Sequence, residues 1–334
     1  MEYRFSNPGD RLACFDLDHT LIKPLGGRKR YTKDLNDAEL AFPNVREKLD
    51  ELRAEGWRIV VFTNQKKKSR ADLPLEVIYA KIDRLLGSDI NVFVAYQNDH
   101  YRKPLMGMWD QLVKLNGEQK EAFYVGDAAG RKGDFSDSDY RFARNINVPF
   151  FTPEQYFLES KVKAPELKEL SWSEPTLTTE LKIEEPTVVM MIGRQASGKS
   201  SFVDDTVYDI PGITVISNDI TGSASKSRTK LRGAIKSNED FILLDNTHSS
   251  RKSRDYFLTE VPARYKKIAV WCEMPYENCR HMDAYRAYTR KCKRIPDVAF
   301  RVYNKKFEEP TLNEFDQIIR YVPEVPPEIK NYFF

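Results

Sequence analysis

The order of apolar and polar positions predicts buried strands alternating with crossover helices over about residues 12 to 150. Short continuous apolar runs are typical of strands that are covered on both faces of a parallel sheet. Parallel strands need crossover connections, which helices commonly supply. In chain order the runs are RLACFDL, WRIVVFTN, NVFVAYQ and EAFYVGD. This part of the chain is therefore expected to be an α/β domain.

The sequence predicts the apolar face and the C-terminal end of one of the intervening helices. Val45, Leu49 and Leu52 fall at i, i+4 and i+7, which places them on one side of a helix. Gly56 follows at a position where a left-handed residue commonly ends a helix.

A second series of apolar runs follows a segment that lacks periodicity. Residues 161–186 contain three prolines and many charges, and we interpret them as a linker that could pack on a domain surface through Leu170 and Trp172. The runs after it are PTVVMMIG, GITVISND, DFILLDN and KIAVWCEM. The chain is thus expected to hold two parallel-sheet α/β domains, at 1–160 and 187–334.

Composition adds limits on the environment of the protein. The four cysteines form no CxxC pair, and no run approaches the 18 or so apolar residues that a membrane span needs. The N-terminus has no apolar leader segment. We therefore expect an intracellular protein in a reducing compartment, without a membrane partner.

Charge is balanced overall, with 53 Lys and Arg against 50 Asp and Glu, but basic residues gather in short runs. Examples are KKKSR at 66–70, SKSRTKLR at 225–232 and SRKSR at 250–254. A single run is commonly a solvated face, whereas several runs favour a polyanionic partner. KKKSR could be a nuclear signal or a DNA contact, so the sequence does not separate nucleus from cytoplasm.

Asp16 and Asp18 lie two residues apart at the end of the first apolar run, in FDLDHTL. Side chains at i and i+2 of a strand point the same way, roughly 7 Å apart. One carboxylate can attack phosphorus to form an acyl phosphate while the other donates and accepts protons. Mg²⁺ prefers carboxylate and phosphate oxygens and would neutralise this crowded charge. The pair favours phosphate removal.

Polar side chains also follow the later strands of the first series. Thr63 and Asn64 close WRIVVFTN, Lys103 follows NVFVAYQ, and Asp127 closes EAFYVGD. Each has an ordinary alternative, as a cap, a surface lysine or a turn residue. Their order along the chain favours one phosphate site, because ligands of open α/β sheets bind at the carboxyl ends of the strands.

These residues, with YVGDAAGR, DFSDSDYRFARN and VPFFTPEQYF, resemble the haloacid dehalogenase superfamily of phosphatases and, within it, the polynucleotide kinase 3′-phosphatases. The resemblance implies that Asp16 is the nucleophile and Asp18 the general acid and base. Asp16, Asp18 and Asp127 are the predicted Mg²⁺ ligands of this half. It assigns Thr63, Asn64 and Lys103 to phosphate binding, and a supporting role to Asp134. One departure follows TNQ, where the family usually has Gly-Ile and then Arg-Gly-Lys, whereas this chain reads KKKSRADLP.

The segment GRQASGKS, residues 193–200, fits the phosphate-binding loop GxxxxGK[ST] and stands between an apolar strand and a helical pattern. Backbone amides of such a loop surround phosphates, the lysine reaches the β and γ phosphates, and the serine hydroxyl binds Mg²⁺. Residues predicted to bind ATP are Gly193, Gly198, Lys199, Ser200 and Ser201, with Ser200 also a metal ligand.

Two carboxylates close later strands of this half. Asp219 follows GITVIS and could accept the proton of an attacking hydroxyl, or merely cap a helix. Asp245 closes DFILLD, where a Mg²⁺ role competes with substrate positioning. Arg280 and Arg286 could stabilise charge on the transferred phosphoryl group or belong to a solvated face.

The resemblance continues through VISND, LLDNTHSSRKSR, CRHMDAYR and FEEPTLNEF, which match the kinase domain of the same family in order. It implies that Asp219 is the general base and that Arg280 and Arg286 belong to a lid over ATP. The family's Asn-Arg-Asp reads Ser217, Asn218, Asp219 here, so an arginine is missing. Candidates to replace it are Arg228, Arg232, Arg251 and Arg254.

Together the two motifs predict an enzyme that heals broken nucleic-acid ends, removing a 3′ phosphate and phosphorylating a 5′ hydroxyl with ATP and Mg²⁺. DNA strand-break repair is the expected role, with a downstream ligase inferred because ligases need the products. The alternatives are RNA end repair by the same activities and an inactive scaffold that binds DNA ends. By resemblance we expect a monomer, with no phosphopeptide-binding module in the roughly 10 residues before the first strand.

Overall fold

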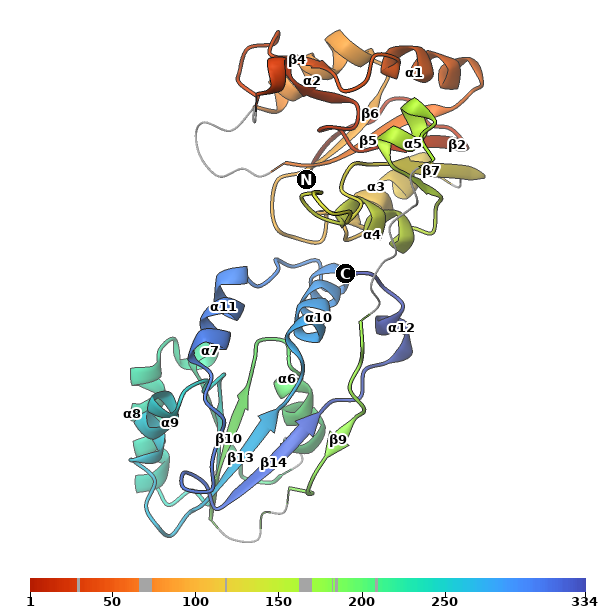
Figure 1. Cartoon of the computed structure of the whole chain (residues 1–334). Coiled ribbons are helices and arrows are strands. Elements are labelled where there is room, and N and C mark those ends of the chain that lie inside the picture. The colour runs from red at the N-terminus through yellow and green to blue at the C-terminus, as the bar shows by residue number, and fades with distance from the viewer. Residues whose placement is uncertain are drawn as a thin grey trace. The chain divides into compact units, whose positions relative to one another are not determined.

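The computed structural model describes residues 1–28, 31–65, 74–117, 119–161, 170–181, 183, 186–207 and 210–334 (Figure 1). By packing, the chain divides into two compact units. The first unit contains Met1–Glu169, Ala284–Arg294 and Tyr332–Phe334, and the second contains Leu170–Asp283 and Ile295–Asn331. The KKKSR run at 66–70 lies outside the described residues.

The first unit is built on a six-stranded sheet in which β1 is antiparallel to β6 and the other neighbours are parallel. In spatial order the strands are β1 (Glu2–Arg4), β6 (Asn91–Ala95), β5 (Arg58–Asn64), β2 (Arg11–Phe15), β7 (Glu121–Val125) and β8 (Phe150–Phe151). A separate hairpin joins β3 (Ile22–Pro24) to β4 (Ala38–Leu40).

Helices cover both faces of this sheet (Figure 1). Alternate residues of a strand point to opposite faces, so Ala13 and Phe15 pack under α1 and α2, whereas Leu12 and Cys14 pack under α3 and α4. The helices are α1 (Val45–Ala54), α2 (Leu75–Leu86), α3 (Gly107–Asn116), α4 (Ser138–Asn145) and α5 (Pro153–Leu158). Gly56 has a φ of +88° just beyond α1, which confirms the expected helix end.

The second unit has a six-stranded sheet of the same kind, parallel except at one edge. Its order is β11 (Thr214–Ser217), β12 (Phe241–Asp245), β10 (Thr187–Gly193), β13 (Lys266–Cys272), β14 (Gln317–Val322) and β9 (Thr176–Leu177). β9 lies inside the segment interpreted as a linker, which therefore contributes an antiparallel edge strand. The ring of Trp172 also packs against His281 within this unit.

Helices cover both faces of the second sheet as well. α8 and α9 pack against Val188 and Met190, and α6 with the π-helix Val203–Val207 packs against Val189 and Met191. The helices are α6 (Lys199–Phe202), α7 (Asn218–Thr221), α8 (Ala224–Lys236), α9 (Arg251–Leu258), α10 (Tyr276–Thr289), α11 (Asp297–Lys306) and α12 (Pro327–Lys330). The end of α10, from Ala284 on, belongs to the first unit. The prediction of two α/β folds with mainly parallel sheets is confirmed.

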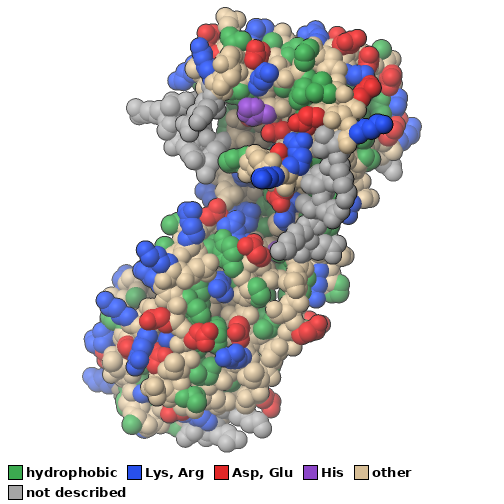
Figure 2. Space-filling model, in the orientation of Figure 1, with side chains coloured by type: hydrophobic (Ala, Val, Ile, Leu, Met, Phe, Trp, Pro, Cys, Tyr) green, Lys and Arg blue, Asp and Glu red, His purple; other side chains and the backbone are tan. Residues whose placement is uncertain are grey.

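The surface is charged and mixed in sign. Figure 2 shows Lys and Arg side chains interspersed with Asp and Glu side chains, and basic side chains are frequent where α8 and α9 lie in the second unit. Among the described residues, no helix is long and apolar enough to cross a bilayer.

Two candidate active sites

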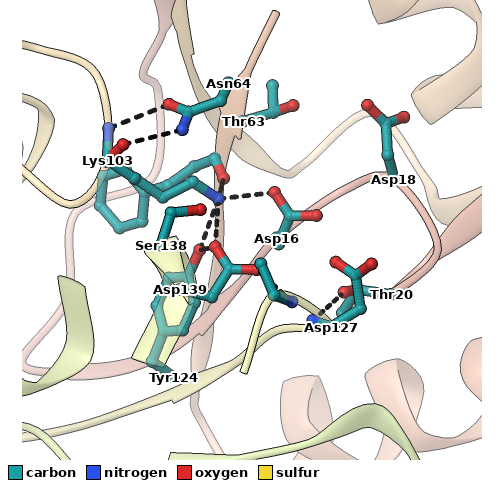
Figure 3. Close-up of polar contacts among 12 residues, drawn as sticks. Asp16, Asp18, Thr20, Thr63, Asn64, Lys103, Tyr124, Asp127, Ser138 and Asp139 are labelled. Atoms are coloured by element: carbon teal, nitrogen blue, oxygen red, sulfur yellow. Dashed lines mark hydrogen bonds and ion pairs between the residues drawn. The ribbon is translucent and has the colours of Figure 1, made fainter. Parts of the chain in front are cut away.

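The carboxyl ends of four neighbouring strands bring most of the predicted phosphatase residues together (Figure 3). Asp16 directly follows β2, Thr63 and Asn64 end β5, and Asp127 follows β7 after one glycine. Lys103 comes from the loop after β6. Parallel strands end at one edge of a sheet, which is why residues so distant in sequence share a site.

Lys103 is the centre of the polar network. Its Nζ lies 2.6 Å from Oδ1 of Asp16 and 2.7 Å from Oδ1 of Asp139, and it donates to the hydroxyl of Tyr124 at 2.8 Å. Only 4% of the Lys103 surface is exposed. Burial alone would lower the pKa of Lys103, but the two carboxylates outweigh it and raise the pKa. The ammonium group therefore stays charged beside Asp16.

Asp139 is a site residue that the sequence analysis missed. Its side chain is buried, and its Oδ2 accepts the backbone N–H of Ala128 at 3.1 Å. Asp134, which was assigned the supporting role, instead accepts hydrogen bonds from Arg131 and from the backbone N–H of Ala129. The run DFSDSD holds three aspartates within six residues, at 134, 137 and 139, and nothing in the strand order distinguishes them.

A glycine makes the approach of Asp139 possible. A Cβ at Gly126 would lie 2.6 Å from Cβ, Cγ and Oδ2 of Asp139, closer than real contacts allow. Gly126 therefore lets α4 place its carboxylate directly beside the end of β7.

Three carboxylates of the first unit form a cluster that fits a divalent cation. Ligand atoms of Asp16, Asp127 and Asp139 lie within 4.8 Å of one another. Burial raises the pKa of Asp16 well above its usual range, although the charge of Lys103 opposes this rise. Burial, together with the charge of Asp139, raises the pKa of Asp127 to about 7. Hard oxygen donors crowded in this way suit Mg²⁺, which would favour their ionised forms.

Asp18 faces a different partner from Asp16. The side-chain amide of Gln65 donates to Oδ2 of Asp18 at 2.7 Å and to Oγ1 of Thr63 at 2.9 Å. Burial raises the pKa of Asp18, and the Gln65 hydrogen bond opposes this rise. A carboxyl whose pKa is raised can carry the proton that a general acid must donate.

Asn64 positions the lysine loop. Its amide group donates to the carbonyl of Lys103 and accepts the backbone N–H of Lys103, each at 3.0 Å. Asn64 thus acts on the Lys103 backbone, while the Thr63 hydroxyl lies beside Gln65 near the aspartates.

The phosphate-binding loop of the second unit runs from the end of β10 into α6. Nζ of Lys199 donates to the carbonyls of Gly193, at 3.0 Å, and Arg194, across the loop where phosphate oxygens would bind. Burial lowers the pKa of Lys199. Gly198 has a φ of +93°, and a Cβ there would lie 2.7 Å from Cγ of Pro323, so glycine is required. The Ser200 and Ser201 side chains are exposed at the start of α6.

Asp219 and Asp245 lie near Lys199. Asp245 ends β12, where it pairs in register with Ser217 of β11, and burial raises its pKa while the Lys199 charge opposes. The hydroxyl of Ser217 caps α7 by accepting the N–H of Asp219 at 3.1 Å. Asp219 is therefore not the cap, and its exposed carboxylate can contact a substrate hydroxyl.

The two arginines that were predicted as lid residues belong to different units of the fold. Arg280 forms an ion pair with Asp297 and lies over the ring of Phe300. Arg286 lies in residues 284–294, which pack with the first unit, and its role as a lid residue stays a prediction.

The four candidates to replace the missing arginine also have acidic partners. Arg254 is fully buried and forms two hydrogen bonds to Glu314, so it is enclosed within the fold. Arg228 and Arg232 pair with Glu260, and Arg251 pairs with Asp255. Of the four, Arg254 is the one that a substrate phosphate cannot reach.

A cavity of about 290 Å³ adjoins the phosphate-binding loop. Val298 and Val302, one helical turn apart on α11, are about half exposed, at 55% and 44%. An aliphatic wall facing polar groups suits a nucleobase or sugar. The lining consists of Gln195, Thr247, Ser249, Val298, Ala299, Val302 and Tyr303.

Comparison with known proteins agrees with this pairing of sites. Residues 11–157 match the family model described as polynucleotide kinase 3 phosphatase. A bifunctional polynucleotide phosphatase/kinase of Schizosaccharomyces pombe is 31% identical over 333 residues, covering 94% of this chain and 79% of the relative. A polynucleotide 3′-phosphatase of Saccharomyces mikatae is 30% identical over 208 residues, an alignment that covers 43% of this chain and 83% of the relative. The chain therefore belongs to the polynucleotide kinase 3 phosphatase family.

Proposed function

We propose that the protein removes 3′ phosphates from nucleic-acid ends in its first unit and phosphorylates 5′ hydroxyls in its second. The observation that carries this proposal is the pairing of Lys103 with Asp16 inside a carboxylate cluster, in a chain that also holds a complete phosphate-binding loop. The fission-yeast relative, named for both activities, is similar along nearly the whole chain.

Phosphate removal begins with attack of an Asp16 oxygen on phosphorus, which breaks the bond to the 3′ oxygen. Asp18 donates its proton to that oxygen, so the strand leaves with a 3′ hydroxyl. Lys103 and the Thr63 hydroxyl bind the phosphoryl oxygens and offset their charge. The covalent product is an acyl phosphate on Asp16.

Water then hydrolyses the acyl phosphate. Asp18, now ionised, accepts a proton from the attacking water, the phosphorus–Asp16 bond breaks, and inorganic phosphate is released with Asp16 restored. Mg²⁺ held by Asp16 and Asp127 would supply positive charge against the crowded oxygens. Asp139 keeps Lys103 charged and directed at Asp16.

Phosphorylation uses the loop 193–200 to hold the phosphates of ATP. Lys199 exchanges its two loop carbonyls for phosphate oxygens, and its charge stabilises the transferred phosphoryl group. Asp219 accepts the proton of the 5′ hydroxyl as its oxygen attacks the γ phosphorus, and ADP leaves. Ser200 and Asp245 would hold Mg²⁺ there, and Arg280 is a candidate to close over ATP.

The cavity beside α11 supports binding of the strand whose 5′ hydroxyl accepts the phosphoryl group. It adjoins Gln195 of the phosphate-binding loop and Thr247, which follows β12 by two residues. We infer that the terminal nucleoside of the acceptor strand binds there, with its base on Val298 and Val302.

DNA strand-break repair is the proposed context, and RNA end repair is the second candidate because the same chemistry serves both. One gel assay separates them, using matched DNA and RNA strands that carry a 5′ hydroxyl and a 3′ phosphate, with Mg²⁺ and ATP. We expect both DNA ends to be processed, faster than the RNA ends. Faster processing of RNA would favour the second candidate. If the folded protein binds the ends but processes neither of them, the proposal is contradicted and the protein is an inactive scaffold that binds nucleic-acid ends.

A further inference from the structure

Phe135 exposes a large aromatic ring beside the candidate phosphatase site. Its side chain is 100% exposed, the highest value among the large apolar residues that the structure describes. It stands in the loop between β7 and α4. Asp127 at the start of this loop and Asp139 in the first turn of α4 both belong to the carboxylate cluster. An aromatic ring in water forgoes roughly 1.5–3 kcal/mol of burial free energy, so its exposure contributes nothing to stability.

The residue before Phe135 is fixed to the start of the loop. Oδ2 of Asp134 accepts the backbone N–H of Ala129 at 3.2 Å and that of Arg131 at 2.9 Å. Nη1 of Arg131 in turn donates to Glu154 of α5 at 2.7 Å. Position 134 is thereby held close to Ala129, two residues beyond Asp127.

The residue after Phe135 is fixed in the same way. The carbonyl of Ser136 accepts the backbone N–H of Gly130 at 3.0 Å. Because both neighbours of Phe135 bond to residues 129–131, the loop folds back on itself and presents the ring at its turn. The ring is exposed on a braced loop that is flanked by two carboxylates of the cluster, Asp127 and Asp139.

We propose that Phe135 is a specificity residue on which the terminal nucleobase of the 3′-phosphorylated strand stacks. The inference rests on the proposed phosphatase function. The reacting phosphate at Asp16 is attached to the terminal nucleoside, so that base is the one nearest the loop. Stacking on an aromatic side chain contributes about 1–3 kcal/mol per base and tolerates any base. Exposed Lys132 in the same loop offers a charge to the adjoining phosphodiester.

The test compares two strands that carry a 3′ phosphate, one with a normal terminal nucleotide and one with an abasic terminal residue. For each protein, the ratio of kcat/KM on the normal strand to kcat/KM on the abasic strand is measured. We expect a ratio of about ten for the wild type, about one for Phe135→Ala, and a retained ratio for Phe135→Trp. Leu158→Ala, which removes an exposed apolar side chain from α5, is the matched control and should keep the wild-type ratio.

The outcomes separate this inference from the function on which it rests. If the wild type releases phosphate but Phe135→Ala keeps its ratio, the stacking role is wrong and the phosphatase function stands. If Phe135→Ala lowers kcat/KM equally on both strands, the residue acts through the loop and the inference is also overturned. If the folded wild type releases phosphate from neither strand, the proposed phosphatase function is wrong, and the stacking role falls with it.

Discussion

Nζ of Lys103 lies 2.7 Å from Oδ1 of Asp139, and both side chains are almost completely buried. A buried ammonium group is stable only with opposite charges close to it. Asp16 is the other carboxylate in contact with Lys103, but it must also attack phosphorus under the proposed mechanism. Asp139 is thus the partner that remains beside Lys103 throughout the reaction.

We therefore expect Asp139→Asn to lower phosphatase kcat/KM by about 100-fold and the free energy of unfolding by about 3 kcal/mol, because a buried charge loses its partner. Asp134→Asn, which affects the more exposed pair with Arg131, should lower kcat/KM by less than about tenfold. Steady-state kinetics and urea unfolding of both variants measure these effects. A larger loss of activity in the Asp134 variant would contradict the assigned role of Asp139.

The difference between these two aspartates shows how far sequence reasoning reaches. Asp16, Thr63, Lys103 and Asp127 could be predicted because each follows an apolar run, and parallel strands end at one edge. Asp139 comes from a helix, and its position depends on a loop reversal and on the absence of a side chain at Gly126. Neither feature is visible in a pattern of apolar residues.

The second unit shows the same limit. The apolar runs predicted its parallel strands, but β9 has only two residues and forms by pairing with β14, which lies more than a hundred residues later. Arg254 is likewise one of four arginines that the sequence offers as a substrate contact, but its pairing with Glu314 encloses it within the fold. Such positions are set by distant partners, which local periodicity does not encode.

The two activities should be separable by single substitutions. Asp16→Asn removes the nucleophile and should lower phosphatase kcat by roughly three orders of magnitude or more, with kinase activity retained. Lys199→Ala should do the reverse, since the loop loses the charge that binds the β and γ phosphates. One strand carrying both ends, assayed for both products, serves for each variant. Loss of both activities in a folded variant would contradict the model of two independent sites.

Mg²⁺ should stabilise the first unit even without substrate. The carboxylates of buried Asp16 and Asp139 and of half-buried Asp127 are crowded together, so a bound cation relieves their repulsion. At a hundred times its dissociation constant, the ion should add about 2.7 kcal/mol to the free energy of unfolding. Thermal unfolding with Mg²⁺ and with EDTA measures the effect. Asp127→Asn should lose most of this increase, and an unchanged increase in that variant would place the ion elsewhere.

Arg254 should matter for stability rather than for substrate binding. Replacing it by methionine leaves Glu314 buried without its partner and should lower the free energy of unfolding by about 3–5 kcal/mol. Arg251→Met, at an exposed position of the same helix, should change stability by less than about 0.5 kcal/mol. Chemical denaturation of the two variants is the measurement. Equal stability in the two variants would contradict a structural role for Arg254.

His248 should make the second unit sensitive to acid. Its Nδ1 contacts the carbonyl of Met191 at 2.8 Å, and burial, reinforced by the charges of Lys199 and Arg254, lowers its pKa to about 4 from 6.5. Between these values the unfolded chain binds a proton that the folded chain does not, so the free energy of unfolding falls as the pH falls. The contribution is complete above pH 6.5 and should decrease by about 2 kcal/mol between pH 7 and pH 5.

The variant His248→Asn isolates this effect. Asparagine tolerates the positive φ of 40° at this position, and its amide can donate to the Met191 carbonyl without titrating. Urea unfolding at pH 7 and pH 5 should therefore give a smaller loss of stability for the variant than for the wild type. Equal losses in the two proteins would mean that His248 is protonated in the folded state at pH 5, and that acid sensitivity arises from other groups.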